Sequence, residues 1–279
     1  MITRKRVYLT LRDDGPEASR ALERDGYAVL PGALTPAEVE ALRAEVTRVY
    51  EELPPDVRHD RPNPWEDFRY EMLNRSALCQ QMVGDRRLLD VIEPLLGEDC
   101  HVIANTAWRN LPRDEYGHGG GFWHIDAGPH VPRPADVPWD DRIPYPIFAV
   151  GVHVMLQDCD ERSGPTAVLR GSHRSGQSPP LERIKDADLT WNDEPPVVLN
   201  AKAGDILLFA SDVWHRRMPT AADDPGRFFL QIHYGRRDLA QRIRPTEEIN
   251  HLSKEATERA KSERERTVIG LHHPLFYDG

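Results

Sequence analysis

One histidine–aspartate pair stands out in the 279-residue sequence as a candidate metal site. His124 and Asp126 form the only H-x-D in the chain, and side chains two positions apart on a strand point to the same face. A third ligand is expected downstream, where His215 follows the apolar run 205–209. Two histidines and one carboxylate form the facial triad of non-haem Fe(II) oxygenases, which leaves other positions on the metal open. We therefore predict that these three residues bind iron and are catalytic.

A basic residue also lies where such chemistry needs one. Arg227 begins an extended run 12 residues after His215. A guanidinium group can hold a dicarboxylate through two parallel hydrogen bonds. We expect Arg227 to bind an acidic cosubstrate beside the metal.

A glycine run just before the metal motif offers a competing interpretation. The stretch H-G-G-G-F, from His118 to Phe122, matches the oxyanion-hole motif of many lipases and esterases. Such a hydrolase also needs a nucleophile elbow, G-x-S-x-G, and the sequence contains none. The expected elements also lack the alternating helices and parallel strands of that class. The sequence therefore disfavours a hydrolase.

The N-terminal part that precedes these motifs, residues 22–100, is predicted to be mainly helical. One helix is expected to begin at Pro36, with Thr35 as its N-cap. A second helical zone covers residues 76–96, and Pro94 is expected to kink or end it. These helices supply an apolar face against which the rest of the chain can pack.

The remainder of the chain changes in character, and we expect one domain over residues 1–279. Residues 101–237 alternate short strands with turns, which is typical of an antiparallel sandwich or barrel. Residues 238–279 are expected to form a charged, largely solvated helical extension. The expected strands cover residues 26–31, 101–108, 147–156, 196–199, 205–209 and 227–234.

Composition limits the classes of partner. Hydrophobic residues make up 39% and charged residues 29%, and the formal net charge is −10. This balance argues against nucleic acid and anionic membranes, both of which select basic surfaces. The three cysteines are odd in number and widely spaced, which disfavours disulfides and favours a reducing compartment. We expect a soluble, cytoplasmic protein, a monomer or homodimer, that acts on a small molecule.

The sequence resembles the phytanoyl-CoA dioxygenase family of Fe(II)/2-oxoglutarate oxygenases, which also includes ectoine hydroxylase. The resemblance spans about residues 22–237. It implies a double-stranded β-helix, a jelly-roll, cupin-like fold that is mainly β with flanking N-terminal helices. The stretches that carry it, besides the metal motif, are D-G-Y-A-V-L-P-G at 25–32, S-G-P-T-A-V-L-R-G-S-H at 163–173 and G-D-I-L-L-F at 204–209.

The resemblance also implies the reactants and their ligands. Iron would be bound by the three predicted ligands, 2-oxoglutarate by Arg227 with Asn110 nearby, and O2 by the remaining position on the metal. The default outcome is hydroxylation of a small molecule, with release of succinate and CO2. Asp126 argues against halogenation, because related halogenases replace this carboxylate with a small residue. A non-catalytic jelly-roll protein that binds a small ligand and retains the metal motif is the alternative.

One position departs from the family pattern. Many members have serine or threonine two residues after the distal histidine, where this chain has Arg217. Either Thr220 substitutes for that hydroxyl, or the cosubstrate pocket is rearranged.

Substrate contacts are expected from a proline-rich segment and from neighbouring aromatic residues and histidines. Residues 127–146 contain six prolines and are predicted to form a lid over the site, with a plain surface connection as the alternative. A hydrogen-bonded core position is the simpler role for His153 and His233, and a turn-stabilising one for His173. The candidate substrate contacts are Trp123, His130, Arg133, Trp139 and His153.

Overall fold

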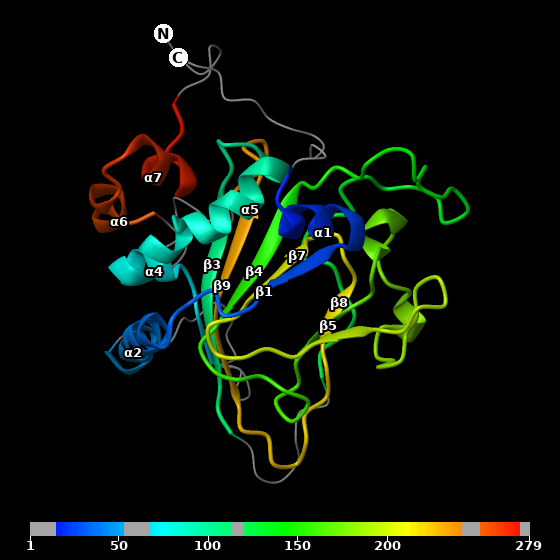
Figure 1. Cartoon of the computed structure of the whole chain (residues 1–279), viewed down its shortest axis with the longest axis horizontal. Coiled ribbons are helices and arrows are strands. Elements are labelled where there is room, and N and C mark those ends of the chain that lie inside the picture. The colour runs from blue at the N-terminus through cyan, green and yellow to red at the C-terminus, as the bar shows by residue number, and fades with distance from the viewer. Residues whose placement is uncertain (1–14, 53–66, 113–119, 242–251, 274–279) are drawn as a thin grey trace.

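Two antiparallel sheets form the centre of the protein (Figure 1). The computed structural model describes residues 15–52, 67–112, 120–241 and 252–273. The larger sheet has six strands in the order β1-β7-β4-β9-β3-β2, and the smaller one has three in the order β6-β5-β8. The strands are β1 (Tyr27–Leu30), β2 (Asp67–Arg69), β3 (His101–Asn110), β4 (Ala149–Met155), β5 (Thr166–Val168), β6 (Val197–Leu199), β7 (Ile206–Ala210), β8 (His215–Arg217) and β9 (Arg227–Gly235).

The strand order is that of a jelly roll and not of a simple meander. β7 lies between β1 and β4, and β9 lies between β4 and β3, so neighbours in the sheet are distant in sequence. An isolated antiparallel bridge between His124 and His215 adds to the small sheet at β8. The predicted double-stranded β-helix is therefore confirmed. Among the described strands, the sequence did not predict the three-residue strands β2, β5 and β8.

The two faces of the large sheet have different roles. Even-numbered residues of β4 and β9 pack into the main apolar core together with the helices that cover this face. These helices, α2 (Pro36–Glu52), α4 (Ala77–Val83) and α5 (Arg86–Leu96), lie along one side of the sheet in Figure 1. Since side chains alternate along a strand, the odd-numbered residues point to the opposite face. The even-numbered core residues are Val150, Val152, Val154, Phe228, Leu230, Ile232 and Tyr234.

The helical part agrees with the sequence in most respects. The Thr35 backbone N–H donates to the Glu38 carboxylate at 2.8 Å, and the Glu38 N–H donates to the Thr35 hydroxyl at 3.3 Å, which confirms the capping box. The predicted zone 76–96 is two helices, because Asp85 caps a new one after Gly84. The sequence did not predict α1. The helices are α1 (Glu17–Asp25), α2 (Pro36–Glu52), α3 (Met72–Arg75), α4 (Ala77–Val83), α5 (Arg86–Leu96, ending two residues after Pro94), α6 (Lys254–Arg259) and α7 (Glu263–Val268), with two 3-10 turns, Ser172–Ser175 and Leu181–Arg183.

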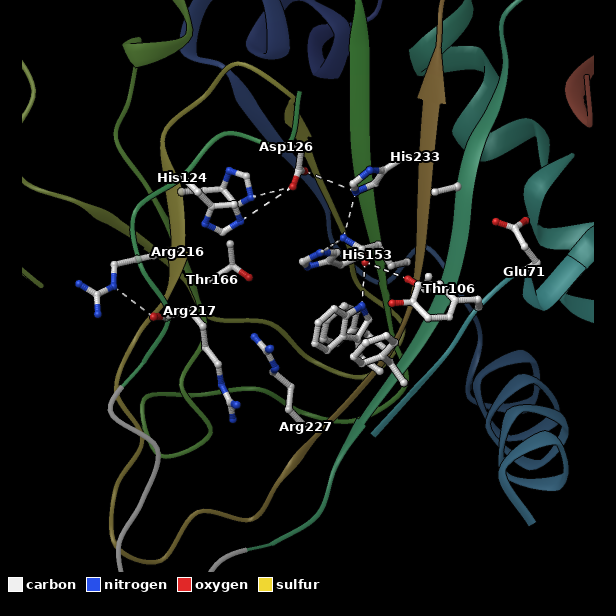
Figure 2. A pocket seen from close by; sticks show the side chains of 18 residues that line it. Glu71, Thr106, His124, Asp126, His153, Thr166, Arg216, Arg217, Arg227 and His233 are labelled. Atoms are coloured by element: carbon white, nitrogen blue, oxygen red, sulfur yellow. Dashed lines mark hydrogen bonds and ion pairs between the residues drawn. The ribbon is translucent and has the colours of Figure 1, made fainter. Parts of the chain in front are cut away.

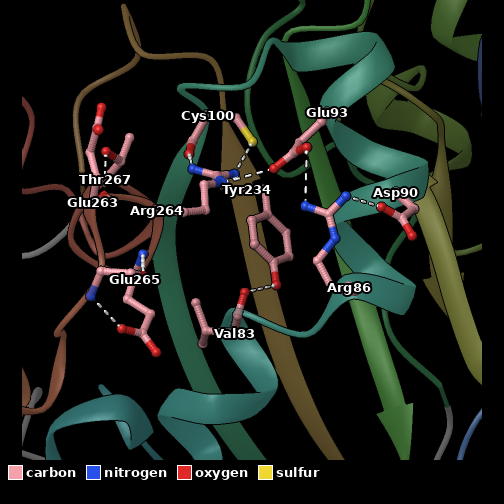
Figure 3. Close-up of polar contacts among 11 residues, drawn as sticks. Val83, Arg86, Asp90, Glu93, Cys100, Tyr234, Glu263, Arg264, Glu265 and Thr267 are labelled. Atoms are coloured by element: carbon pink, nitrogen blue, oxygen red, sulfur yellow. Dashed lines mark hydrogen bonds and ion pairs between the residues drawn. The ribbon is translucent and has the colours of Figure 1, made fainter.

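The C-terminal helices pack against the body of the protein, so the expectation of a largely solvated extension is wrong. Arg264 of α7 donates to the Glu93 carboxylate at 2.8 Å and to the Cys100 carbonyl at 3.0 Å (Figure 3). Gln80 of α4 donates to the Ala256 carbonyl at 2.8 Å. Although this segment is rich in charged residues, four of its apolar residues pack into the main core. They are Ala256, Ala260, Val268 and Ile269.

The cysteines and the described helices bear on the expected compartment and on membrane insertion. All three cysteines, Cys79, Cys100 and Cys159, are buried and free. No helix within the described ranges is long and apolar enough to cross a membrane.

Candidate active site

The three predicted metal ligands converge, and Figure 2 shows His124 beside Asp126. Asp126 Oδ1 lies 3.9 Å from His124 Nε2 and 3.6 Å from His215 Nε2. All three ligand atoms lie within 4.8 Å of one another. The strand expected around His124 is reduced to its single bridge with His215, because glycines precede it and a Gly-Pro pair follows. His215 begins β8, so the two histidines are held side by side by backbone pairing.

Backbone hydrogen bonds orient both imidazole rings. His124 Nδ1 lies 2.7 Å from the Phe122 carbonyl oxygen, and His215 Nδ1 lies 2.9 Å from that of Val213. Because a carbonyl only accepts hydrogen bonds, each Nδ1 carries the proton and each Nε2 keeps its lone pair. Both lone pairs are therefore available to a metal beside Asp126.

The charges around Asp126 keep its carboxylate ionised. Burial alone would raise the pKa of Asp126, but the nearby imidazoles of His215 and His233 outweigh it and hold the pKa well below its usual range. Burial opposes protonation of His215, yet the Asp126 carboxylate raises the pKa of that imidazole. His233 Nε2 lies 3.4 Å from Asp126 Oδ2. The carboxylate is thus a permanent anion at the centre of the site.

The triad opens into a cavity of about 420 Å³. A register shift between Val102 and Ala104 places later even-numbered residues of β3 on the cavity side, whereas Val102 faces the main core. The same face of the large sheet presents the odd-numbered residues of β9. Besides the metal ligand His215, the strands contribute Phe68, Ala104, Thr106, Trp108, His153, Thr166, Arg216, Arg217, Arg227, Phe229, Gln231 and His233.

Arg227 lies on the cavity wall where the sequence predicts a carboxylate-binding group. It is buried, and its guanidinium carbon lies 4.9 Å from the ring centre of Phe229. Its Nε–H donates to Asn110 Oδ1 at 3.3 Å, and Nη1 donates to the Gly164 carbonyl at 3.4 Å. Asn110 does not line the cavity, so it contacts Arg227 and fixes the direction of the guanidinium plane.

Arg217 lines the cavity at the position where many family members have a hydroxyl. Its Nη2 donates to the Ser163 carbonyl at 3.1 Å and lies 3.7 Å from the buried carboxylate of Asp224, which balances its charge. Thr220 does not line the cavity. Thr166, directly opposite Arg217 in the β5–β8 register, does line it. A threonine hydroxyl is therefore present on this wall, on the neighbouring strand and not at position 220.

A glutamine that the sequence did not single out joins several cavity residues. The indole N–H of Trp108 donates to Gln231 Oε1 at 2.7 Å, and the Thr106 hydroxyl lies 2.9 Å from the same oxygen. The amide nitrogen of Gln231 therefore faces His233 Nε2 at 2.9 Å and His153 Nε2 at 3.4 Å. Burial, together with the charge of Arg227, lowers the pKa of His153 well below its usual range, so His153 is a neutral hydrogen-bond acceptor on the cavity wall.

Trp123 and His173 have structural surroundings. Trp123 was expected to contact substrate, but it is 2% exposed in a small apolar cluster outside the cavity. Its indole N–H donates to the Asp186 carbonyl at 2.6 Å. His173 Nε2 lies 3.0 Å from the Glu23 carbonyl, so its ring joins the Ser172–Ser175 turn to α1.

The proline-rich segment 127–146 does not cover the cavity. The His130 imidazole and backbone N–H both hydrogen-bond to the Asp212 carboxylate, and the guanidinium of Arg133 lies 5.1 Å from the ring centre of Trp139. None of the residues 127–146, all of which the structure describes, lines the cavity. The lid expectation is therefore corrected in this structure: the segment's polar and aromatic groups bind neighbouring loops.

Comparison with known families decides the family of the chain. Residues 22–222 match the family model described as phytanoyl-CoA dioxygenase. The chain belongs to the phytanoyl-CoA dioxygenase family. Among its curated relatives, the ectoine dioxygenase of Nocardia farcinica is 26% identical over 222 residues, which cover 71% of this chain and 70% of the relative. That of Sphingopyxis alaskensis is 25% identical over 239 residues, 75% of this chain and 73% of the relative.

Three solved structures illustrate the similarity in fold. EctD from S. alaskensis, in its apoform, gives a TM-score of 0.61 at 22% identity and covers 84% of each chain. HygX from Streptomyces hygroscopicus, with nickel and 2-oxoglutarate bound, gives 0.60 at 20% identity over 81% of this chain and 88% of that one. The epimerase SnoN gives 0.60 at 18% identity, over 79% and 82%. At these identities the likeness establishes the fold.

Proposed function

We propose that this family member is a non-haem Fe(II)/2-oxoglutarate-dependent dioxygenase that hydroxylates a C–H bond of a small-molecule metabolite or natural-product intermediate, releasing succinate and CO2. The observation that carries the proposal is the convergence of His124, Asp126 and His215 on the cavity that Arg227 also lines. A relative named as an Fe(II)/2-oxoglutarate-dependent dioxygenase, nvfF of Aspergillus novofumigatus, supports the same cofactors for this chain.

The donor set fits Fe(II). Two imidazole nitrogens and one carboxylate oxygen are the ligands of the facial triad, and they leave positions for reactants. His124 and His215 are held with Nε2 inward by their backbone hydrogen bonds, and Asp126 remains ionised. Bound there, iron with 2-oxoglutarate and O2 supplies the oxidising power for C–H chemistry. The protein supplies the ligands, orients both organic reactants and excludes water.

Arg227 holds the distal carboxylate of 2-oxoglutarate. The Asn110 side chain and the Gly164 carbonyl accept hydrogen bonds from Nε and Nη1 and so fix the guanidinium plane against which the carboxylate binds. Thr166 lies on the same cavity wall and provides the hydroxyl that position 217 lacks. Because Arg227 is buried, the pair forms away from bulk water, where its electrostatic attraction is strongest.

Hydroxylation is the proposed outcome among the reactions that this fold hosts. The curated relatives of this chain, at 23–29% identity, are named dioxygenases. The epimerase SnoN and the carbocyclase SnoK share the fold at 18% and 17% identity. The higher sequence similarity to dioxygenases favours hydroxylation over epimerisation or ring formation.

Oxygen uptake distinguishes this enzyme from a non-catalytic binding protein. The purified protein with Fe(II) and 2-oxoglutarate should consume O2 and form succinate slowly. Both rates should rise when a panel of metabolites is screened and the compound added is the substrate. Asp126→Ala should abolish both, whereas Asp136→Ala, a change at an exposed position outside the cavity, should not alter either. Absence of O2 uptake and succinate from the iron-loaded wild type across the panel would favour the alternative, a jelly-roll protein that only binds a ligand.

We further propose that residues 1–279 act as one cytoplasmic oxygenase domain. The contribution of α6 and α7 to the main core supports a single domain. Three free and buried cysteines support a reducing compartment. The small-molecule partner follows from the cavity volume of about 420 Å³, which is in the range of ligand pockets. Monomer or homodimer stays a prediction.

A further inference from the structure

A buried carboxylate outside the active cavity joins the proline-rich segment 127–146 to the chain that leads into the distal metal ligand. Asp212 lies three residues before His215, and it is 6% exposed. It accepts hydrogen bonds from the His130 ring, from the His130 backbone N–H at 3.0 Å and from the Tyr145 hydroxyl at 2.8 Å. Both donor residues belong to the segment 127–146. These three hydrogen bonds offset the cost of keeping the carboxylate away from water.

The segment has local features that fix the geometry around Asp212. The His130 ring stacks on that of Phe148, with ring centres 4.9 Å apart and planes 8° apart. Burial and the charge of Asp212 raise the pKa of Tyr145, so its hydroxyl stays protonated and donates. Gly128 has a φ of +112°, and a Cβ atom there would lie 2.9 Å from Asp212 Oδ1. A glycine is therefore needed where the segment passes the carboxylate.

The loop that carries Asp212, residues 211–214, orients two of the three metal ligands. The Ser211 carbonyl accepts a hydrogen bond from the Asp126 backbone N–H at 3.0 Å. The Val213 carbonyl accepts one from the Nδ1–H of His215 at 2.9 Å. Asp212 is the residue between these two carbonyls. A displacement of this loop would therefore move the Asp126 carboxylate and turn the His215 imidazole.

The ends of the loop are anchored separately from its middle. The Ser211 N–H donates to the Ala149 carbonyl at 3.0 Å, and the Trp214 N–H donates to the Ser172 hydroxyl at 2.8 Å. Between these two anchors, the Asp212 side chain supplies the polar contacts to another segment. The position of the middle of the loop therefore depends on the hydrogen bonds that Asp212 accepts.

We propose that Asp212 is a positioning residue for the metal centre. The segment 127–146 holds its carboxylate, and the loop 211–214 passes this constraint to the ligands Asp126 and His215. Metal ligands depend on the groups that orient them, and here that orientation comes from a segment outside the cavity. The inference deepens the proposed function and rests on it, because it assigns the segment a role in binding the iron.

Co(II), whose visible absorption reports the arrangement of its ligands, is the probe for this proposal. It is titrated by calorimetry into metal-free protein, and the absorption bands of the bound ion are recorded. Asp212→Ala should bind Co(II) about 10–100-fold less tightly than the wild type, the usual effect of losing a group that supports metal ligands. Tyr145→Phe, which removes one hydrogen bond and leaves the ring, should weaken binding less. Both variants should shift the absorption bands.

Tyr234→Phe is the matched control for Tyr145→Phe. Tyr234 is also a buried tyrosine, but its hydroxyl donates to the Val83 carbonyl at 2.8 Å, between the large sheet and α4. The two variants should lose similar stability in thermal unfolding, whereas the control should keep the wild-type affinity and absorption bands. A change in the bands that is confined to Tyr145→Phe and the Asp212 variant separates positioning from a general loss of stability. Asp212→Asn replaces Asp212→Ala if that variant fails to fold by circular dichroism.

The test also separates this inference from the proposed function. Failure of the wild type to bind Co(II) would refute the proposed function. Hydrogen exchange of the Asp126 amide in metal-free protein then decides the role of the segment, and it should be faster in Tyr145→Phe than in Tyr234→Phe. Wild-type affinity and absorption bands in folded Tyr145→Phe and Asp212 variants, or equal exchange of that amide in the two tyrosine variants, would overturn the inference.

Discussion

Replacing Arg227 with alanine should weaken 2-oxoglutarate binding severely. The side chain is 6% exposed, held by Asn110 at 3.3 Å, and stacked on Phe229. Truncating one member of a buried, hydrogen-bonded charge pair costs about 2–5 kcal/mol. The dissociation constant of 2-oxoglutarate should therefore rise by about 30-fold to several thousand-fold. Arg227→Lys should restore only part of the affinity, because an ammonium cannot form two parallel hydrogen bonds in one plane.

Anaerobic calorimetric titration of 2-oxoglutarate into the Fe(II)-loaded protein measures this effect directly. Arg162→Ala is the matched control, because Arg162 is an exposed arginine that forms an ion pair with Asp223 at 3.2 Å, away from the cavity. The control should bind 2-oxoglutarate as the wild type does. An unchanged dissociation constant in a folded Arg227→Ala variant would refute the reasoning, and Arg217 would become the candidate for the carboxylate contact.

Three further predictions concern single side chains. Thr166→Val should weaken 2-oxoglutarate binding by about 2- to 13-fold, the value of one hydrogen bond of about 0.5–1.5 kcal/mol, whereas Thr220→Val should not; equal effects in the same titration would contradict the cavity lining. Burial lowers the pKa of His173 to about 4 in the folded protein, so the unfolded chain binds a proton first as the pH falls below 6.5. Between pH 7 and pH 4 the free energy of unfolding should fall by about 3 kcal/mol more in the wild type than in His173→Gln, as denaturant titrations would show. Arg264→Ala should lower stability by about 1–3 kcal/mol through its lost contacts with Glu93, without altering 2-oxoglutarate affinity; a raised or unchanged melting temperature would argue against it.

The metal ligands and Arg227 could be predicted from the sequence, because few residue types can bind iron or hold a carboxylate through two hydrogen bonds. A histidine and a carboxylate two positions apart, a distal histidine after an apolar run, and an arginine at a strand start are local patterns. The structure retains their relation even though the strand at His124 is only one bridge. The capping box at Thr35 was predictable for the same reason, since its partners are three residues apart.

The rest of the site depends on contacts that no local pattern contains. Thr166 reaches the cavity through its register with Arg217 on another strand, and Gln231 is defined by partners on β3 and β4. The register shift after Val102 decides which residues of β3 face the cavity. Glu71 lies there because of a left-handed backbone that glutamate rarely adopts.

The amino-acid composition of a loop also does not determine whether the loop packs over the cavity or against its neighbours. The segment 127–146 begins beside Asp126 and carries groups suited to a ligand, yet His130 binds Asp212 and Trp139 donates to the Ile143 carbonyl at 2.5 Å. The same side chains can bind a substrate or a neighbouring loop, and only tertiary structure decides between them. The packing of the C-terminal helices was not predicted for a similar reason, since only four buried apolar residues, Ala256, Ala260, Val268 and Ile269, lie within a charged sequence.

The central claim is that one cavity holds iron on His124, Asp126 and His215 and 2-oxoglutarate on Arg227. A crystal of the protein prepared anaerobically with Fe(II) and 2-oxoglutarate tests it directly, with anomalous data collected at the iron edge. We predict one anomalous peak per chain among His124 Nε2, Asp126 Oδ1 and His215 Nε2, and density for the 2-oxoglutarate distal carboxylate at the Arg227 guanidinium. Iron bound elsewhere, or 2-oxoglutarate density away from Arg227, would contradict the account.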